Sequence, residues 1–292
     1  ETGLTSGIIL LGSNLAGNAT STGTLNLNGG TLATNRTITG GTAASSFFNF
    51  NGGTLKANGT IATLATSLTT VNVRDGGGII DTNSFNISIA KSLTHSIIEG
   101  DNAIDGGITK IGAGVLTFTG TDANTYTGLT RVHAGELALS KTTGVSAIAG
   151  DITLGDGSAA VVLRLVNSDQ IADTSVITFL GTEANAGIFR LNGRTETIGG
   201  LSSTGGAGFV ENESATSIAL TLNNAGTQTF SGILRNGTLA GVLALIKNGA
   251  GTQILSGAST YTGTTTINAG TLQFGADNVI SASSALVIAA AG

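Results

Sequence analysis

ITKIGAGVLTFTGTDANTYTGLTRVHAGELAL, residues 108–139, returns later in the chain as LIKNGAGTQILSGASTYTGTTTINAGTLQF, residues 245–274. The copies share a lysine two residues before Gly-Ala-Gly, the letters TYTG and an Ala-Gly pair. A recurring block of this size is the signature of a repeat architecture, in which each copy encodes one structural unit. We therefore expect the shared glycines to be structural turns between strands: Gly112, Gly114, Gly120, Gly128, Gly135, Gly249, Gly251, Gly257, Gly263 and Gly270.

A second echo gives the length of one coil. LNLNGGTLATN at residues 25–35 recurs as FNFNGGTLKAN at residues 48–58. The period is about 23 residues, within the range of solenoid repeats. At ~3.3 Å per residue such a coil traces roughly 76 Å, enough for two or three short strands around a narrow apolar core. The chain would then stack roughly 13 coils into a rod roughly 60 Å long. We predict an all-β parallel β-helix, one continuous β-solenoid over residues 1–292 with repeat-like blocks at 25–58, 108–139 and 245–274.

Composition favours the same architecture. The chain has 46 glycines, no proline and only 10% charged residues. Proline removes a backbone donor from a strand ladder, so its absence suits a chain whose strands are paired on both sides. Alternating polar and apolar residues bounded by glycine and asparagine indicate strands, and no segment has a convincing helical period. An ordinary β-sandwich would alternate too, but it would not repeat a motif at the spacing of a coil.

Charge and residue usage argue against several partners. The formal net charge is −5, and the 12 lysines and arginines are scattered singly, without a basic stripe for phosphates. We therefore expect no nucleic acid as a partner. No apolar run approaches the ~18 residues of a membrane-spanning helix, so no membrane-spanning segment is expected. The absence of cysteine leaves no disulfides and no thiolate metal sites.

The order of the motifs resembles a known family. KxGAG, an alternating strand ending in [ST]G, a short loop, TYTG, a further strand and [NH]AGxL are similar to the passenger-associated (autotransporter-associated) β-strand repeats of bacterial surface proteins. The similarity covers roughly residues 108–140 and 186–292, and His133 and Glu136 depart from the usual small or polar residues. The resemblance implies an extracellular right-handed β-helix on a bacterial cell surface, often within a larger adhesin, and it carries no catalytic residues.

We expect no catalytic residue, no cofactor and no dedicated metal site. The two histidines, His95 and His133, follow no nucleophile motif, and LGDGSAA at residues 154–160 precedes a strand rather than the helix that a dinucleotide fingerprint requires. One weak Ca²⁺ candidate remains, because carboxylates and carbonyls in a turn can hold this ion. Its residues are Glu99, Asp101 and Asp105, and solvated turn acids are the alternative.

Three functions are open to such a chain. The leading hypothesis is a non-enzymatic structural or adhesive rod whose partners are flanking segments or other copies of the same surface protein and a host or matrix surface. The second is a filament subunit that stacks end to end through open coils. The third is a carbohydrate-active β-helix, which rests on the acidic turns and the Phe47-Phe48 pair. Contacts are expected where the repeat copies differ, at Arg131/Thr266, His133/Asn268, Glu136/Thr271 and the loop tip between Gly120 and Thr125.

Overall fold

The chain folds into a stack of short parallel strands. The computed structural model describes residues 8–12, 21–41, 45–181, 183–204 and 208–289. These residues contain thirty strands, no α-helix and a single 3-10 turn at Glu183–Asn185. The strands are β1 (Ile8–Leu11), β2 (Thr22–Leu27), β3 (Thr31–Thr34), β4 (Thr37–Gly40), β5 (Ser45–Phe50), β6 (Thr54–Ala57), β7 (Ile61–Thr66), β8 (Thr70–Val73), β9 (Gly78–Asp81), β10 (Ile87–Ile89), β11 (Leu93–His95), β12 (Ile108–Ile111), β13 (Val115–Gly120), β14 (Thr130–Val132), β15 (Gly135–Lys141), β16 (Ile152–Leu154), β17 (Val161–Leu165), β18 (Val176–Leu180), β19 (Gly187–Arg190), β20 (Glu196–Ile198), β21 (Gly200–Thr204), β22 (Gly208–Glu211), β23 (Ile218–Leu222), β24 (Thr227–Phe230), β25 (Ile233–Arg235), β26 (Leu243–Lys247), β27 (Thr252–Leu255), β28 (Thr265–Ile267), β29 (Thr271–Phe274) and β30 (Leu286–Ile288).

Five parallel sheets form the faces of a solenoid. Sheet A has the order β1-β4-β7-β10-β13-β15-β17-β19-β22-β25. Sheet B is β11-β8-β5-β2, and sheet C is β21-β18-β16-β14-β12-β9-β6-β3. Sheet D is β20-β23-β26-β28-β30, and sheet E is β24-β27-β29. The chain visits the faces in turn: β4, β5 and β6 lie on sheets A, B and C, and β19, β20 and β21 on sheets A, D and C. Sheet D thus takes the place of sheet B, and sheet E continues sheet C.

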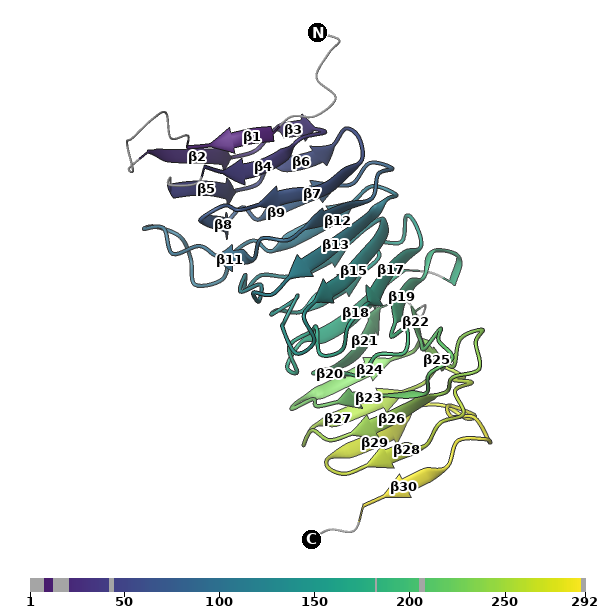
Figure 1. Ribbon diagram of the computed structural model, residues 1–292. Helices are drawn as coiled ribbons and strands as arrows, with labels where there is room; N and C mark the ends of the chain where they lie inside the picture. The colour runs from purple at the N-terminus through teal and green to yellow at the C-terminus, as the bar shows by residue number, and fades with distance from the viewer. Residues whose placement is uncertain (1–7, 13–20, 42–44, 182, 205–207, 290–292) are drawn as a thin grey trace.

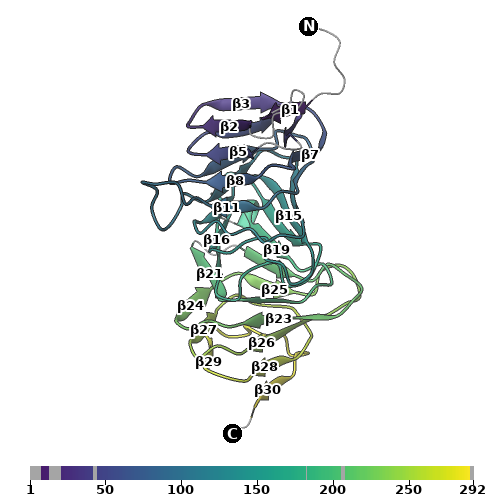
Figure 2. The same ribbon diagram turned by 60° about the vertical axis from the view of Figure 1, so that its left-hand side comes forward.

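The coils stack into a rod with the first described strand, β1, near one end and the last, β30, at the other (Figure 1). Figure 2 shows β2, β5, β8 and β11 one below another in the upper half, and β23, β26, β28 and β30 in the same arrangement below. The described residues make about 11 turns. The expected all-β parallel solenoid is confirmed, whereas the expected count of roughly 13 coils is not.

The register explains the smaller number of turns. Strand β5 lies on β2 with Phe48 opposite Leu25, so the echo in the sequence is the coil spacing at this point. Elsewhere the spacing varies. The coil from Ile108 to its register partner Thr130 contains slightly fewer residues, and the coil from Gly78 to its register partner Ile108 contains many more. Dividing the chain by a single period therefore overcounts the coils, because insertions between strands lengthen several of them.

Stacked apolar side chains form the core. On sheet A one inward row places each side chain on its register partner in the next coil, and every member is fully or almost fully buried: Leu116, Leu137, Leu163, Phe189, Val210 and Leu234. Each such side chain contributes about 1.5–3 kcal/mol when it leaves water. The inner rows therefore hold the rod together and leave the outer faces free for contacts.

Candidate functional site

The two repeat blocks wind around the rod in different phases. In the first block Lys110 lies on β12 of sheet C, and the next strand, β13, lies on sheet A. In the second block Lys247 lies on β26 of sheet D, and the next strand, β27, lies on sheet E. Because sheets D and E take the places of B and C, the second block is rotated by one face relative to the first. The block therefore encodes the shape of a coil and not the face on which the coil begins.

The shared lysine of the first block points into the rod. Lys110 is fully buried, and burial lowers its pKa to about 8. Its ammonium donates to neutral acceptors on its own coil and on both neighbouring coils: Gly112 O at 2.7 Å, Ala134 O at 2.9 Å, Thr82 Oγ1 at 3.0 Å and Ile111 O at 3.1 Å. One side chain thus ties the Gly-Ala-Gly turn of its own coil to the Ala-Gly turn of the next coil.

The lysine of the second block makes the equivalent contacts. Lys247 is fully buried, and its Nζ donates to Gly249 O and, at 3.4 Å, to Ala269 O. Burial lowers the pKa of this lysine as well. The motif lysine is therefore a buried cross-link between consecutive turns in both copies.

The TYTG segment supplies a second buried polar link. In both copies the tyrosine hydroxyl and a threonine hydroxyl four residues later are 2.6 Å apart, for Tyr126 with Thr130 and for Tyr261 with Thr265. All four side chains are fully buried, and burial raises the pKa of both tyrosines. The ring fills the core, while the hydroxyl finds the partner that a buried polar group requires.

The ten shared glycines lie in bends or at strand ends, where the coils come closest together. A Cβ atom at any of them would lie less than 3.0 Å from a backbone atom of the preceding coil. Gly135 and Gly270, which end the Ala-Gly pairs, also have φ values of +67° and +66°, in the left-handed region that favours glycine. These positions therefore combine a turn with a close approach between coils.

A carboxylate or amide on the preceding coil holds the TYTG turn. Asp105 accepts hydrogen bonds from the backbone N–H groups of Thr127 at 2.7 Å and Gly128 at 2.9 Å. In the second copy, Asn236 Oδ1 accepts from Thr262 N at 3.1 Å. The anchor residue lies outside the repeated letters, so the comparison of the two copies missed it.

His95 joins this anchor without forming a catalytic triad. His95 Nδ1 lies 3.0 Å from Asp105 Oδ2 and 3.3 Å from Thr127 Oγ1. In a triad the two ring nitrogens face the acid and the nucleophile separately. Here both partners share Nδ1, so the imidazole cannot relay a proton between them.

The acids of the calcium candidate are engaged elsewhere or exposed. Asp101 pairs with Arg74, Asp105 holds the TYTG turn, and Glu99 is exposed. The described part of the chain contains no group of three His, Asp or Glu residues placed to hold a metal ion. Within the same residues, no helix is long and apolar enough to span a membrane.

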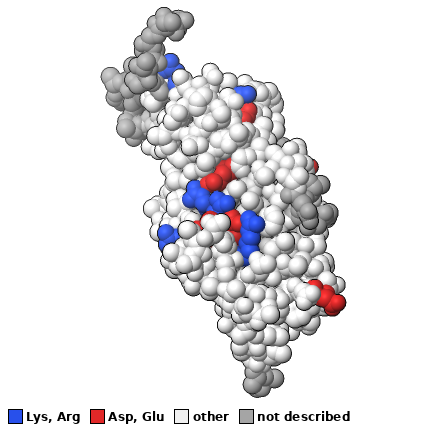
Figure 3. All heavy atoms as spheres, turned by 90° about the vertical axis from the view of Figure 1, so that its right-hand side faces the viewer, with Lys and Arg blue, Asp and Glu red and all other residues white. Residues whose placement is uncertain are grey.

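The differing positions of the first repeat contribute to pairs within the rod. Glu136 Oε1 binds Arg164 Nε at 2.6 Å, and His133 Nδ1 lies 3.8 Å from Asp156 Oδ2. Further along sheet A, Glu211 lies between two arginines, Arg190 at 2.8 Å and Arg235. Figure 3 shows acidic and basic side chains gathered at mid-length on one face, with only a few charged side chains elsewhere on it. The opposite charges of these pairs neutralise one another. The pairs therefore link neighbouring coils and do not form a site for an ion.

Residues 96–107 form a long loop, which we call loop 96–107, beside sheet B. It connects β11 to β12 with twelve residues, where the connections β5–β6 and β8–β9 have three and four. Arg74 holds the Asp101 carboxylate by two hydrogen bonds of 2.8 Å and keeps the pKa of that carboxyl below its usual range. Asp75 accepts from the backbone N and Nδ2 of Asn102 at 2.8 and 2.7 Å. The loop is thus fastened to the turn that follows β8.

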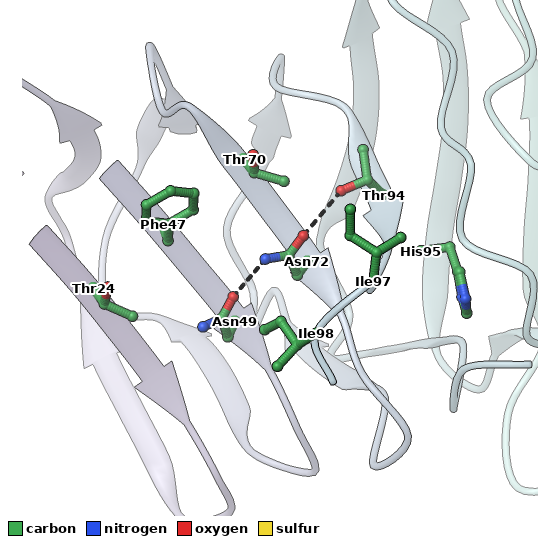
Figure 4. Close-up of a pocket in the computed structure, with 9 residues that line it drawn as sticks. All are labelled: Thr24, Phe47, Asn49, Thr70, Asn72, Thr94, His95, Ile97 and Ile98. Atoms are coloured by element: carbon green, nitrogen blue, oxygen red, sulfur yellow. Dashed lines mark hydrogen bonds between the residues drawn. The ribbon is translucent and has the colours of Figure 1, made fainter. Parts of the chain in front are cut away.

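A cleft of about 550 Å³ lies between loop 96–107 and the outer face of sheet B (Figure 4). Amide side chains cross its floor as a ladder, because Asn49 Nδ2 donates to Asn26 Oδ1 and Asn72 Nδ2 to Asn49 Oδ1, each at 2.7 Å. Figure 4 shows the ladder continuing to Thr94. The cleft is lined by Thr24, Phe47, Asn49, Thr70, Asn72, Thr94, His95, Ile97 and Ile98.

The sequence contained signals for some of these features. Both tyrosines of the chain lie in the TYTG segments, and a lysine recurs at the same place in a chain with few charges. We interpreted the shared letters as turns and apolar core, and the buried lysine fits neither class. The cleft left no local signal, because its walls come from four strands and one loop.

Comparisons with known proteins agree with the repeat geometry. The family model of the Passenger-associated-transport-repeat matches residues 108–139 and 245–274, the two blocks that carry the buried lysine, the Tyr–Thr pair and the close-packed glycines. Searches of curated proteins and of solved structures gave no match. The chain carries two passenger-associated transport repeats, each built as consecutive coils of a parallel β-solenoid.

Proposed function

We propose that the chain is a non-enzymatic structural or adhesive rod, a passenger-type segment of a bacterial surface protein. The observation that carries the proposal is the placement of both passenger repeats as coils within one parallel solenoid. We further propose that the solenoid is continuous over residues 1–292 and right-handed, because crossovers between parallel strands of one sheet are almost always right-handed. Its partners are flanking segments or other copies of the same surface protein and a host or matrix surface.

Surface location is tested on intact cells of the source bacterium. Antibodies against residues 1–292 should label unpermeabilised cells, and external protease should remove the label while an internal marker protein survives. Label that appears only after permeabilisation would contradict the surface assignment.

End-to-end assembly is a second candidate function. The last described coil exposes apolar side chains that coils in the middle of the rod bury. Phe274 is 40% exposed on β29, and Leu286, Val287 and Ile288 are 46%, 46% and 70% exposed on β30. This face suits a further coil, which either the same polypeptide or a second copy supplies.

Electron microscopy of the purified chain separates these two sources. Discrete rods indicate that the apolar face of the last described coil is covered by the same polypeptide, whereas fibres of indefinite length indicate that it is covered by a second copy. In the second case Ile288→Glu should shorten the fibres, because a carboxylate would be buried at every junction. A matched Leu239→Glu change on the flank of the rod, where Leu239 is 52% exposed, should leave the fibre length unaltered.

The carbohydrate-active alternative has weaker support. Glycoside hydrolysis requires two facing carboxyl groups, and the nine residues that line the cleft include no aspartate or glutamate. Release of reducing ends or unsaturated products from a panel of acidic and neutral polysaccharides would contradict the non-enzymatic proposal.

A further inference from the structure

We propose that the cleft between sheet B and loop 96–107 binds a neutral oligosaccharide. This inference deepens the proposed adhesive function and rests on it for its biological role, while the binding chemistry follows from the cleft. A volume of about 550 Å³ lies within the ~300–1,000 Å³ typical of small-ligand sites.

The floor of the cleft offers an aromatic ring beside a row of amides. Phe47 pairs in register with Thr24 and Thr70, and the next outward row along the strands holds Asn49 and Asn72. Outward rows on a strand are ~7 Å apart, so a ligand the size of one sugar ring contacts both. The ring suits the C–H face of a sugar, and the amides suit its hydroxyl groups.

The amide row retains capacity for further hydrogen bonds. Asn72 donates one N–H to Asn49 and accepts from Thr94 at 3.3 Å, and Asn49 donates to Asn26. A primary amide has two N–H groups and two lone pairs, so Asn49 and Asn72 each retain one of each. Asn49 and Asn72 are only 5% and 8% exposed. Amides that are covered and yet incompletely used favour a ligand that both donates and accepts, as a sugar hydroxyl does.

The lining also determines the charge of the ligand. The nine residues include no lysine, arginine, aspartate or glutamate. The ring of His95 is committed through Nδ1 to the buried Asp105 carboxylate. Acidic sugars are normally bound by arginine or lysine, and a chain of net charge −5 repels them. The cleft therefore fits an uncharged glycan.

Loop 96–107 supplies the apolar wall. Ile97 is 93% exposed and Ile98 37%, and both line the cleft. Ordering a twelve-residue loop costs conformational entropy, and its polar fastenings to Arg74 and Asp75 hold it in place without burying these isoleucines. An apolar peptide side chain would also contact them, but it would leave the remaining N–H and lone pair of each amide unpaired, which costs free energy. A sugar contacts the apolar wall through its C–H groups and hydrogen-bonds to the amides of the floor through its hydroxyl groups.

The test is isothermal titration of the purified 292-residue chain with defined hexasaccharides. Cellohexaose, maltohexaose and N-acetylchitohexaose are the neutral probes, and a heparin hexasaccharide is the acidic comparator. At least one neutral probe should bind with a Kd below about 10 mM and more tightly than heparin. Phe47→Ala should weaken that binding about tenfold or more, and Ile97→Ala about threefold.

Leu239→Ala is the matched control, because Leu239 is also an exposed apolar residue but lies outside the cleft. It should bind like the wild type. Ile97 is almost fully exposed, so its variant keeps the test valid if Phe47→Ala fails to fold. Absence of neutral binding, tighter binding of heparin, or unaltered binding by both cleft variants would overturn the proposal. A concentration-dependent dimer in sedimentation that Ile97→Ala abolishes would instead assign the cleft to a second copy. Surface labelling of cells is independent of these readouts, so the two proposals can fail separately.

Discussion

Replacing Lys110 with methionine tests whether the repeat lysine is a buried cross-link. Methionine keeps much of the apolar stem and removes the ammonium. The carbonyls of Gly112 and Ala134 then lose a donor, at a cost of about 1–3 kcal/mol each when no water replaces it. Removing the buried charge offsets this loss, because burial lowers the pKa from 10.5 to about 8, which corresponds to roughly 3 kcal/mol. At pH 7 we therefore expect Lys110→Met to change the free energy of unfolding by no more than about 3 kcal/mol.

The pH dependence of this difference is the sharper prediction. The folded lysine releases its proton near pH 8, whereas the unfolded lysine keeps it until about 10.5. Between these values the unfolded state binds more protons, so the stability of the wild type rises with pH. From pH 8 to 9.5 the gain is about 2 kcal/mol, and the methionine variant lacks it. Lys110→Met should thus be about 2 kcal/mol more destabilising at pH 9.5 than at pH 7.

Urea unfolding followed by circular dichroism at both pH values measures this difference. Lys91→Met, at a half-buried position, controls for the general loss of one positive charge. A stability gap between wild type and Lys110→Met that stays constant or narrows as the pH rises would refute the buried-ammonium interpretation.

Three further predictions concern other buried or fastened groups. Tyr126→Phe removes the 2.6 Å bond to Thr130 and should lower the free energy of unfolding by about 1 kcal/mol in urea melts, whereas a neutral result would make the hydroxyl pair dispensable. Glu196 is 2% exposed and burial raises its pKa to about 8 from 4.5, so the wild type should lose about 2.5 kcal/mol of stability between pH 5 and 7 relative to Glu196→Gln; parallel pH profiles would contradict this. Asp101→Asn should speed amide hydrogen exchange in loop 96–107 without altering exchange in sheet A, and unaltered loop protection would show that the Arg74 pair is not a fastening.

The sequence predicted the solenoid because its clearest periodicity equals the number of residues between register partners on neighbouring coils. The echo between residues 25–35 and 48–58 places Asn26 under Asn49 and Thr31 under Thr54, which are register partners in the structure. Parallel stacking puts equivalent residues of successive coils in contact, so a repeat in the sequence becomes a row in space. The same reasoning identified both repeat blocks, which the family comparison matches.

The remaining features depend on variation between coils, which one period cannot describe. The coil from Gly78 to Ile108 is much longer than the coil from Ile108 to Thr130, so the number of turns and the rotated phase of the second block were not predictable. Loop 96–107 lengthens one coil, and its fastening by Arg74 joins side chains that lie on different coils. The buried Lys110 contradicts the general rule that lysine is exposed, and only its four acceptors explain why it is tolerated.

On the outer face of sheet B, the regular spacing between coils also aligns polar side chains that do not belong to the core. Inward rows of the core tolerate irregular coils, because leucine, isoleucine and phenylalanine can take one another's place within a row. An outward ladder of amides is less tolerant, since each Asn must lie directly above the last to bond it at 2.7 Å. Asn26, Asn49 and Asn72 follow one another at the same spacing in both steps and are register partners on β2, β5 and β8. The recurrence that revealed the fold thus includes Asn26 and Asn49 of the amide ladder, and one spacing serves both the stacking of coils and the alignment of the amides.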